Sequence, residues 1–299
     1  MTDRFSGVVT PILTPYNDDM SIAKDLYLGH AAKCLSDGAH YLSPFGTTSE
    51  ALSNSARERM EMLELLVSSG TARADQLMPG TGLCSLEETL TLSKHAVELG
   101  CAAVMTLPPF FFVTAPDEGL YRYFSSLIES VASDRLKICL YHIPQNTGIG
   151  ISPDLAARLN EAFPETVVAY KDSSGKWDNT QSVIEKAPGI SVFPGSESMM
   201  NPAMALGGGG CISASCNSNV AGIRKLYDLI RSGDQTAADA LAPQIDAHRQ
   251  AVQGGGLIPG LKALKAKQSG DDRWLNLRPP LLPADPALAS ELNDTLAQI

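Results

Sequence analysis

The sequence predicts an α/β fold, a (β/α)8 TIM barrel with a C-terminal helical extension. Two observations predict it. Eight short apolar segments alternate with helical patterns along the chain, and eight such units are the number in this barrel. The apolar segments are continuous rather than alternating, which is typical of parallel strands that are buried on both faces. A doubly wound open sheet is the alternative, but it usually carries fewer units and a nucleotide-binding fingerprint, and Gly80-Thr81-Gly82 lacks the third glycine of that motif.

The eight expected strands are 7–13, 40–43, 76–79, 102–107, 136–141, 167–171, 190–193 and 207–213. Helical patterns start near residues 22, 56, 86, 117, 153, 179, 197 and 220. Ser55 with Glu58, and Ser85 with Glu88, have the spacing of a capping box. Pro153 suits a first helical turn, where its missing N–H costs little. Each expected strand is therefore followed by an expected helix.

The last part of the chain has a different pattern. After residue 233 no apolar strand occurs, and 235–251, 257–268 and 286–296 have helical patterns. We therefore expect a catalytic barrel domain over 1–232 and a helical extension over 233–299, packed on the barrel or on a partner subunit.

Composition limits the possible functions. The chain has 299 residues, a net charge of −10 and scattered basic residues, which argues against a nucleic-acid surface. No apolar run approaches the roughly 20 residues of a membrane span, and the first residues lack the apolar core of a signal peptide. The six cysteines form no CxxC pair, so we expect free thiols and a cytoplasmic location.

In a (β/α)8 barrel the active site lies at the carboxyl ends of the strands. Lys171 lies at the end of the apolar run 167–170, where burial disfavours a charged ammonium group and the neutral amine can form a Schiff base with a carbonyl substrate. The alternative is a lysine that extends outward and pairs with a carboxylate such as Asp172. Strand alternation, however, points adjacent side chains to opposite faces.

Other strand ends supply complementary groups. Tyr141 can move the protons of carbinolamine formation, and the hydroxyls of Thr47 and Thr48 with nearby N–H groups can hold a carboxylate. Each residue also has a structural alternative. Thr47 and Thr48 could form only an ST-turn, Tyr141 could be a buried tyrosine with a satisfied hydroxyl, and Ser213 could merely end a strand.

Metal chemistry has little support. The five histidines show no HxH or HExxH spacing, and alternation turns His142 away from the face of Tyr141. We expect no metal and no cofactor, which makes a metal-dependent aldolase a weak rival.

Four ordered motifs resemble those of the dihydrodipicolinate synthase/N-acetylneuraminate lyase family, and the resemblance covers almost the whole chain. They are Gly46-Thr47-Thr48-Ser49-Glu50, Leu140-Tyr141-His142-Ile143-Pro144, Ala169-Tyr170-Lys171-Asp172-Ser173-Ser174-Gly175 and Gly210-Cys211-Ile212-Ser213. The resemblance implies a pyruvate-dependent class I aldolase and a homotetramer built from tight dimers. By the family pattern, Lys171 forms the Schiff base, Tyr141 transfers protons, Thr47 and Thr48 bind the pyruvate carboxylate, and Ile212 lines the pocket floor.

Two departures from the family pattern bear on substrate and activity. Asn146 stands where the synthase has an arginine for the carboxylate of aspartate semialdehyde, and 144–148 is more similar to 4-hydroxy-2-oxoglutarate aldolases. We therefore expect a 4-hydroxy-2-oxoglutarate or 2-keto-3-deoxy sugar acid substrate, with dihydrodipicolinate synthase as the alternative. The run Phe110-Phe111-Phe112 has no hydroxyl where the family usually has tyrosines that reach a neighbouring subunit. A catalytically impaired pyruvate sensor or structural subunit is therefore a second alternative.

Overall fold

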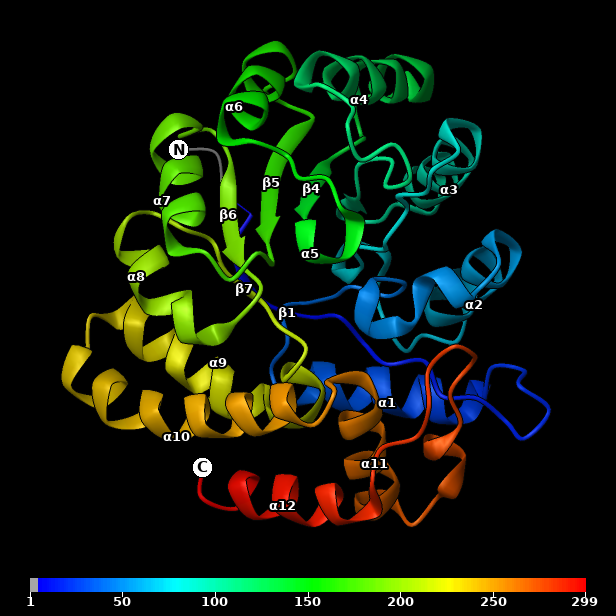
Figure 1. Cartoon of the computed structure of the whole chain (residues 1–299), viewed down its shortest axis with the longest axis vertical. Helices are drawn as coiled ribbons and strands as arrows, with labels where there is room; N and C mark the ends of the chain where they lie inside the picture. The colour runs from blue at the N-terminus through cyan, green and yellow to red at the C-terminus, as the bar shows by residue number, and fades with distance from the viewer. Residues whose placement is uncertain (1–4) are drawn as a thin grey trace.

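The computed structural model describes residues 5–299 and contains a ring of parallel strands. Helices surround the strands (Figure 1). The strands are β1 (Gly7–Thr10), β2 (Tyr41–Leu42), β3 (Val104–Thr106), β4 (Ile138–His142), β5 (Val167–Asp172), β6 (Ser191–Pro194) and β7 (Gly210–Ile212). Strand β1 pairs in parallel with both β2 and β7, and β3 to β6 pair in parallel in chain order.

Two further links close the ring. The Gly209 N–H donates to the Val192 carbonyl over 2.9 Å, which joins β7 to β6. The stretch 77–80 lies between β2 and β3, because the Met78 N–H donates to the Leu42 carbonyl and the Met105 N–H to the Pro79 carbonyl, each over 2.8 Å. The expected strand at 76–79 is thus reduced to single bridges at Leu77 and Gly80. The barrel is the fold that the sequence predicts.

Helices cover the outside of the ring. They are α1 (Lys24–Ser36), α2 (Ala56–Ser68), α3 (Leu86–Leu99), α4 (Asp117–Val131), α5 (Pro144–Thr147), α6 (Pro153–Ala162), α7 (Trp177–Lys186), α8 (Met200–Ala205) and α9 (Cys216–Ser232). Short 3-10 turns occur at η1 (Thr47–Ser49), η2 (Ala51–Ser53), η3 (Ala74–Gln76), η4 (Glu197–Met199) and η5 (Asp272–Leu275).

The helix starts follow the expected caps with a few differences. Ser55 and Glu58 form the full capping box of α2, and Ser85 accepts from the Glu88 N–H at the start of α3. Helix α9 begins at Cys216, four residues before the expected start at 220, because a first turn precedes a break at Asn219. The single turn α5 was not expected from the sequence, since one turn of helix leaves no periodic pattern.

Strand alternation divides the core into two layers. Val9, Met78, Met105, Cys139 and their neighbours pack inside the ring, and the alternate strand residues pack outward against the helices. Both faces of the strands are therefore buried, as their continuous apolar sequences predict.

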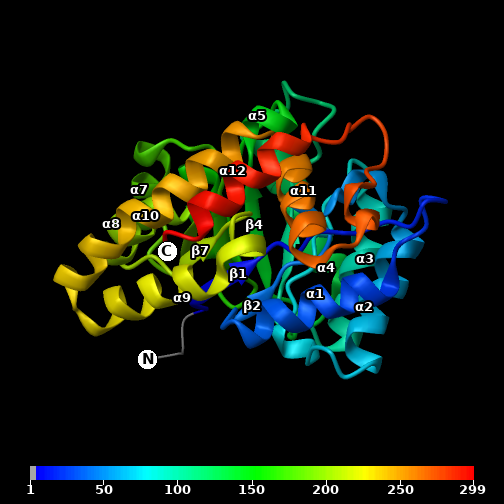
Figure 2. The ribbon, with the colours of Figure 1, turned by 90° about the horizontal axis from the view of Figure 1, so that it is seen from below.

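Three helices follow the barrel: α10 (Gln235–Gly254), α11 (Ile258–Ser269) and α12 (Pro286–Leu296). Helices α10 and α12 lie side by side in both views (Figures 1 and 2), and the three helices share a small apolar core around Leu261, Leu264 and Trp274. The division of the chain at residue 233 stays a prediction. Among the described residues, no helix is long and apolar enough to cross a membrane.

Candidate active site

Lys171 and Tyr141 lie side by side inside the barrel. They are direct register partners on the parallel strands β5 and β4, so their side chains leave the sheet on the same face. Lys171 is 4 % exposed, and its Nζ lies 4.2 Å from the centroid of the Tyr141 ring. The apolar strand thus places a buried amine against the ring of a phenol.

Tyr141 is tied to the loop that follows β2. Its hydroxyl lies 3.0 Å from Thr47 Oγ1, and either group can be the donor. Thr47 and Thr48 form the 3-10 turn η1, which ends at Glu50 in the left-handed region with φ 54°. The turn brings the Thr47 hydroxyl to the phenol, so that Tyr141 contacts Lys171 through its ring and Thr47 through its hydroxyl.

These residues line one cavity of about 720 Å³, which we call the lysine cavity. Every residue that the sequence predicted for the site lines it: Thr47, Thr48, Tyr141, Asn146, Lys171 and Ile212. Asn146 lies on the single turn α5, and Ile212 is the last residue of β7. Five separate elements therefore contribute to a single space at the carboxyl ends of the strands.

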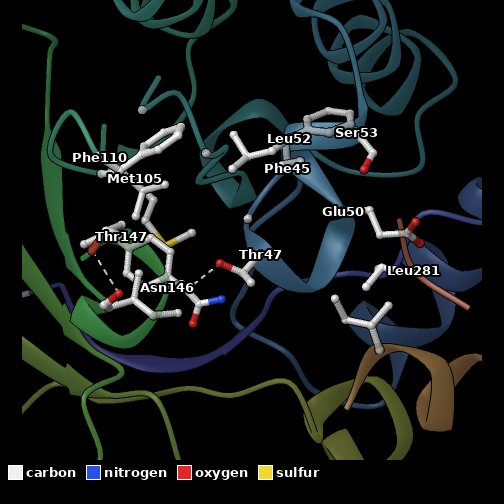
Figure 3. A pocket seen from close by; sticks show the side chains of 18 of the residues that line it. Phe45, Thr47, Glu50, Leu52, Ser53, Met105, Phe110, Asn146, Thr147 and Leu281 are labelled. Atoms are coloured by element: carbon white, nitrogen blue, oxygen red, sulfur yellow. Dashed lines mark hydrogen bonds between the residues drawn. The ribbon is translucent and has the colours of Figure 1, made fainter. Parts of the chain in front are cut away.

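A second pocket of about 370 Å³ adjoins the lysine cavity and shares Thr47, Tyr141 and Asn146 with it. In Figure 3, Thr47 and Asn146 lie near the centre of this pocket, and Phe110 and Leu52 lie along one side of it. Phe111 and Phe112 are 78 % and 69 % exposed. Only the first phenylalanine of the run 110–112 lines the pocket, and the other two project from the surface.

Asp172 and His142 belong to a supporting layer. Asp172 lines the cavity, but its carboxylate accepts from Thr180 Oγ1 at 2.7 Å, Asn179 Nδ2 at 2.8 Å and the Ser174 N–H at 2.9 Å. His142 Nδ1 accepts from the Ile151 N–H over 3.0 Å, and burial lowers the pKa of His142. Neither residue forms a hydrogen bond or ion pair with Lys171 among the described contacts, as strand alternation predicts.

A second polar group borders the cavity near the end of β7. The buried Glu197 carboxylate accepts from the hydroxyls of both Ser213 and Ser215. Arg249 of α10 donates from Nη1 to Ser213 Oγ over 3.2 Å and lines the lysine cavity. Ser213 thus supports other side chains instead of facing the cavity. Arg249 and Glu197 were not expected from the sequence, because neither follows an apolar strand directly or lies in a recognisable motif.

Groups of three or more histidine, cysteine or carboxylate side chains with metal-binding geometry do not occur in the part of the chain that the structure describes. That this chain works without a metal remains a prediction.

Comparison with known proteins decides the family. The model of the dihydrodipicolinate synthetase family matches residues 4–299. The chain belongs to this family. It is 32 % identical to an uncharacterized DapA-like lyase of Chloroflexus aurantiacus over 281 residues. This match covers 93 % of this chain and 91 % of that protein. It is 30 % identical over 240 residues to a 4-hydroxy-tetrahydrodipicolinate synthase of Methanopyrus kandleri, covering 80 % of this chain and 78 % of the relative.

Solved structures agree. The crystal structure of dihydrodipicolinate synthase from Agrobacterium tumefaciens superposes with a TM-score of 0.87 at 27 % identity, over 99 % of both chains. The protein is therefore an enzyme, a Schiff-base-forming lyase of the class I aldolase type, on a barrel shared with these relatives.

Proposed function

We propose that this enzyme is a pyruvate-dependent class I aldolase whose Schiff base forms on Lys171. The observation that carries the proposal is the contact between the buried Lys171 amine and the Tyr141 ring, with the Tyr141 hydroxyl 3.0 Å from Thr47 Oγ1. A nucleophilic amine, a proton carrier beside it and hydroxyls for the substrate carboxylate are the three groups that this chemistry needs.

The groups support a balanced cleavage of a 4-hydroxy-2-oxo acid. The Lys171 amine attacks the C2 ketone, and water leaves as the imine forms. Removal of the C4 hydroxyl proton breaks the C3–C4 bond, an aldehyde departs, and the bonding electrons move into a C2–C3 enamine. The enamine takes a proton at C3, and water then releases pyruvate and restores the amine. Tyr141 carries these protons, and Thr47 with Thr48 binds the C1 carboxylate.

The identity of the substrate depends on Asn146. An amide cannot bind a carboxylate with the bidentate fork of an arginine, and Asn146 lines the lysine cavity from α5. We infer that 4-hydroxy-2-oxoglutarate or a 2-keto-3-deoxy sugar acid is cleaved better than aspartate semialdehyde is condensed with pyruvate. The condensation of aspartate semialdehyde should have the lower kcat/KM by roughly 10- to 150-fold, the contribution of one charge-assisted hydrogen bond.

The test compares kcat/KM for cleavage of the two acid classes with kcat/KM for condensation of pyruvate and aspartate semialdehyde, in the wild type and in Asn146→Arg. We expect cleavage to be faster in the wild type and condensation to improve in the variant. A wild-type condensation above about 10⁴ M⁻¹s⁻¹, typical of well-evolved enzymes, would instead support dihydrodipicolinate synthase. Treatment with a chelator should leave the wild-type rate unchanged.

A second candidate function is an impaired enzyme that binds pyruvate as a sensor or structural subunit. It is favoured by Phe111 and Phe112, which are exposed and have no hydroxyl to contribute to a neighbouring subunit. Pyruvate trapped on Lys171 without turnover of any aldehyde would support it. We further infer a homotetramer and a cytoplasmic location, the latter supported by the free state of all six cysteines.

A further inference from the structure

Arg249 introduces a positive charge into the lysine cavity from an element outside the strand ends. It lies on α10, and among the residues that line this cavity Lys171 and Arg249 are the two cations. Asp172 is the one carboxylate of the lining, and three donors already occupy it. The cavity therefore has an excess of positive charge.

The Arg249 guanidinium is held in place without being neutralised directly. Nη1 donates to Ser213 Oγ over 3.2 Å, and Nη2 donates to Gln253 Oε1 over 3.3 Å. The Ser213 hydroxyl in turn donates to the buried Glu197. Glu197 thus orients Arg249 through a serine, and within the described residues no carboxylate lies within ion-pair distance of Arg249.

Much of the hydrogen-bonding capacity of Arg249 is unused. A guanidinium has five N–H donors, and the two bonds above occupy two of them. Nε is buried and has no partner within the described part of the chain. Nη1 and Nη2 each keep one further N–H donor, and a carboxylate or phosphate oxygen in the cavity would accept from them in a charge-assisted bond.

On the proposed function, the other charged sites of the substrate are already assigned. Lys171 is consumed by the imine, and Thr47 with Thr48 holds the C1 carboxylate, which leaves Arg249 without a ligand. We propose that Arg249 binds a second anionic group at the far end of the substrate, so that the enzyme selects dianionic 2-oxo acids. Of the acids named in the proposed function, this favours 4-hydroxy-2-oxoglutarate, whose far end carries a carboxylate. Ser196, Ser198 and Gln253 complete a polar lining for the substrate hydroxyls.

The test uses 2-oxo acids that form the imine without needing an aldehyde partner. Adduct formation on Lys171 is measured by borohydride reduction and mass spectrometry over a concentration series. 2-Oxoglutarate is compared with 2-oxopentanoate, and 2-oxoadipate with 2-oxohexanoate. The two acids of a pair have the same number of carbon atoms and differ only in whether the last carbon is a carboxylate or a methyl group. The two pairs differ in length, so they test two distances between the imine on Lys171 and the terminal carboxylate that Arg249 would bind.

The variants are Arg249→Met, which removes the charge, and Arg249→Lys, which keeps the charge but cannot form the two parallel hydrogen bonds of a guanidinium with a carboxylate. Arg57→Met is the matched control, because Arg57 lies on the surface of α2 and, within residues 5–299, pairs with Glu61 alone. We expect the wild type and Arg57→Met to prefer the dianion of at least one pair by roughly 10- to 150-fold. Arg249→Met should lose this preference, and Arg249→Lys should keep part of it.

The outcomes separate the two proposals. If Arg249→Met traps pyruvate like the wild type but keeps the full preference for dianions, the role of Arg249 is wrong and the aldolase proposal stands. An equal loss for dianionic and monoanionic acids would show a structural role only, and would also overturn it. If neither pyruvate nor any other 2-oxo acid is trapped on wild-type Lys171, the proposed function itself fails.

Discussion

At the scale of single residues, the account depends on the phenol beside the amine. Tyr141 is buried, lies against Lys171 Nζ and shares a hydrogen bond with Thr47. Such a group can move a proton between the hydroxyl of a bound substrate and the Thr47 side without any rearrangement of the backbone. The arrangement gives each of the three residues a separate task.

Tyr141→Phe should lower kcat for cleavage by about 10²–10⁴, the usual contribution of a positioned acid–base group. The ring and its contact with Lys171 remain, so imine formation with pyruvate should be slowed but still complete. The measurement is steady-state cleavage together with the final amount of trapped adduct. A fall in kcat below about threefold would mean that water, entering beside Phe110, carries the protons instead.

The residues of the site could be predicted only in part. Lys171, Tyr141 and Thr47 follow apolar strands, and barrel topology gathers all strand ends at one face, so their position in sequence determines their position in space. Arg249 could not be found this way. It lies within a helix whose orientation depends on how the extension packs, and local sequence does not encode that packing.

At the scale of elements, a buried ion pair fixes the threonine turn to the extension. Lys262 of α11 donates to Glu50, both side chains are fully buried, and Lys262 Nζ also donates to the Asn276 carbonyl over 2.8 Å. Burial lowers the pKa of Lys262 to about 8, while the Glu50 carboxylate acts in the opposite direction. Glu50 ends the turn that carries Thr47 and Thr48, so helix α11 helps to position the carboxylate-binding hydroxyls.

Lys262→Met should destabilise the fold by about 3–5 kcal/mol, because the buried Glu50 carboxylate loses its ion-pair partner and keeps the Arg278 N–H, which donates to Oε2 over 3.1 Å. The combined variant Glu50→Gln/Lys262→Met should recover much of this loss, since neither charge then remains. Urea unfolding measures both free energies. Lys33→Met is the control, because the Lys33–Asp37 pair is exposed and should contribute about 0.5 kcal/mol or less. A loss for Lys262→Met no larger than for Lys33→Met would contradict this role.

The elements were predicted well where local chemistry determines them. The Ser55–Glu58 box and Pro153 at a first turn are set by neighbouring residues. The stretch 77–80 and the turn α5 were not predicted correctly, because their conformation depends on contacts with residues that are distant in the sequence. A Cβ at Gly80 would lie 2.0 Å from the Phe45 carbonyl oxygen, which shows how closely that segment is packed against the loop after β2.

At the scale of the whole molecule, buried neutral histidines make the fold sensitive to acid. His30 Nε2 lies 2.8 Å from Asn217 Oδ1 and therefore donates to it, and the ring packs edge-on against Trp274. Burial, and less strongly the nearby Lys265, lowers the pKa of His30 to about 3. Burial also lowers the pKa values of His40, His142 and His248.

Because these pKa values are lower in the folded state, the unfolded chain binds more protons as pH falls below about 6.5. Stability should therefore be full above that pH and decline towards pH 3. For His30 alone the loss at pH 4.5 is roughly 2–3 kcal/mol. Urea unfolding at pH 7.5 and 4.5 measures it. His30→Gln, which keeps a donor for Asn217, should show a smaller drop between the two pH values, and an equal drop would contradict the assignment.

The exposed apolar side chains beside α4 bear on assembly. Phe111, Phe112 and Val113 project from consecutive positions, and exposed apolar groups of this kind mark interaction surfaces. If the enzyme assembles from tight dimers through this surface, Phe112→Asp should shift its sedimentation towards smaller species. Lys94→Asp, at an exposed lysine on α3, should leave the sedimentation unchanged. Unchanged sedimentation of the Phe112 variant would place the interface on another face.

The most direct test of the central claim is where pyruvate becomes attached. Wild-type enzyme is incubated with pyruvate, reduced with borohydride, digested and analysed by peptide mass spectrometry, with Lys171→Ala and Lys262→Met as parallel samples. The account predicts one reduced pyruvate on the peptide that contains Lys171 in the wild type, none in Lys171→Ala, and an adduct on Lys171 in whatever fraction of Lys262→Met is folded. An adduct on Lys262 or another lysine, or a catalytically active Lys171→Ala enzyme, would contradict it.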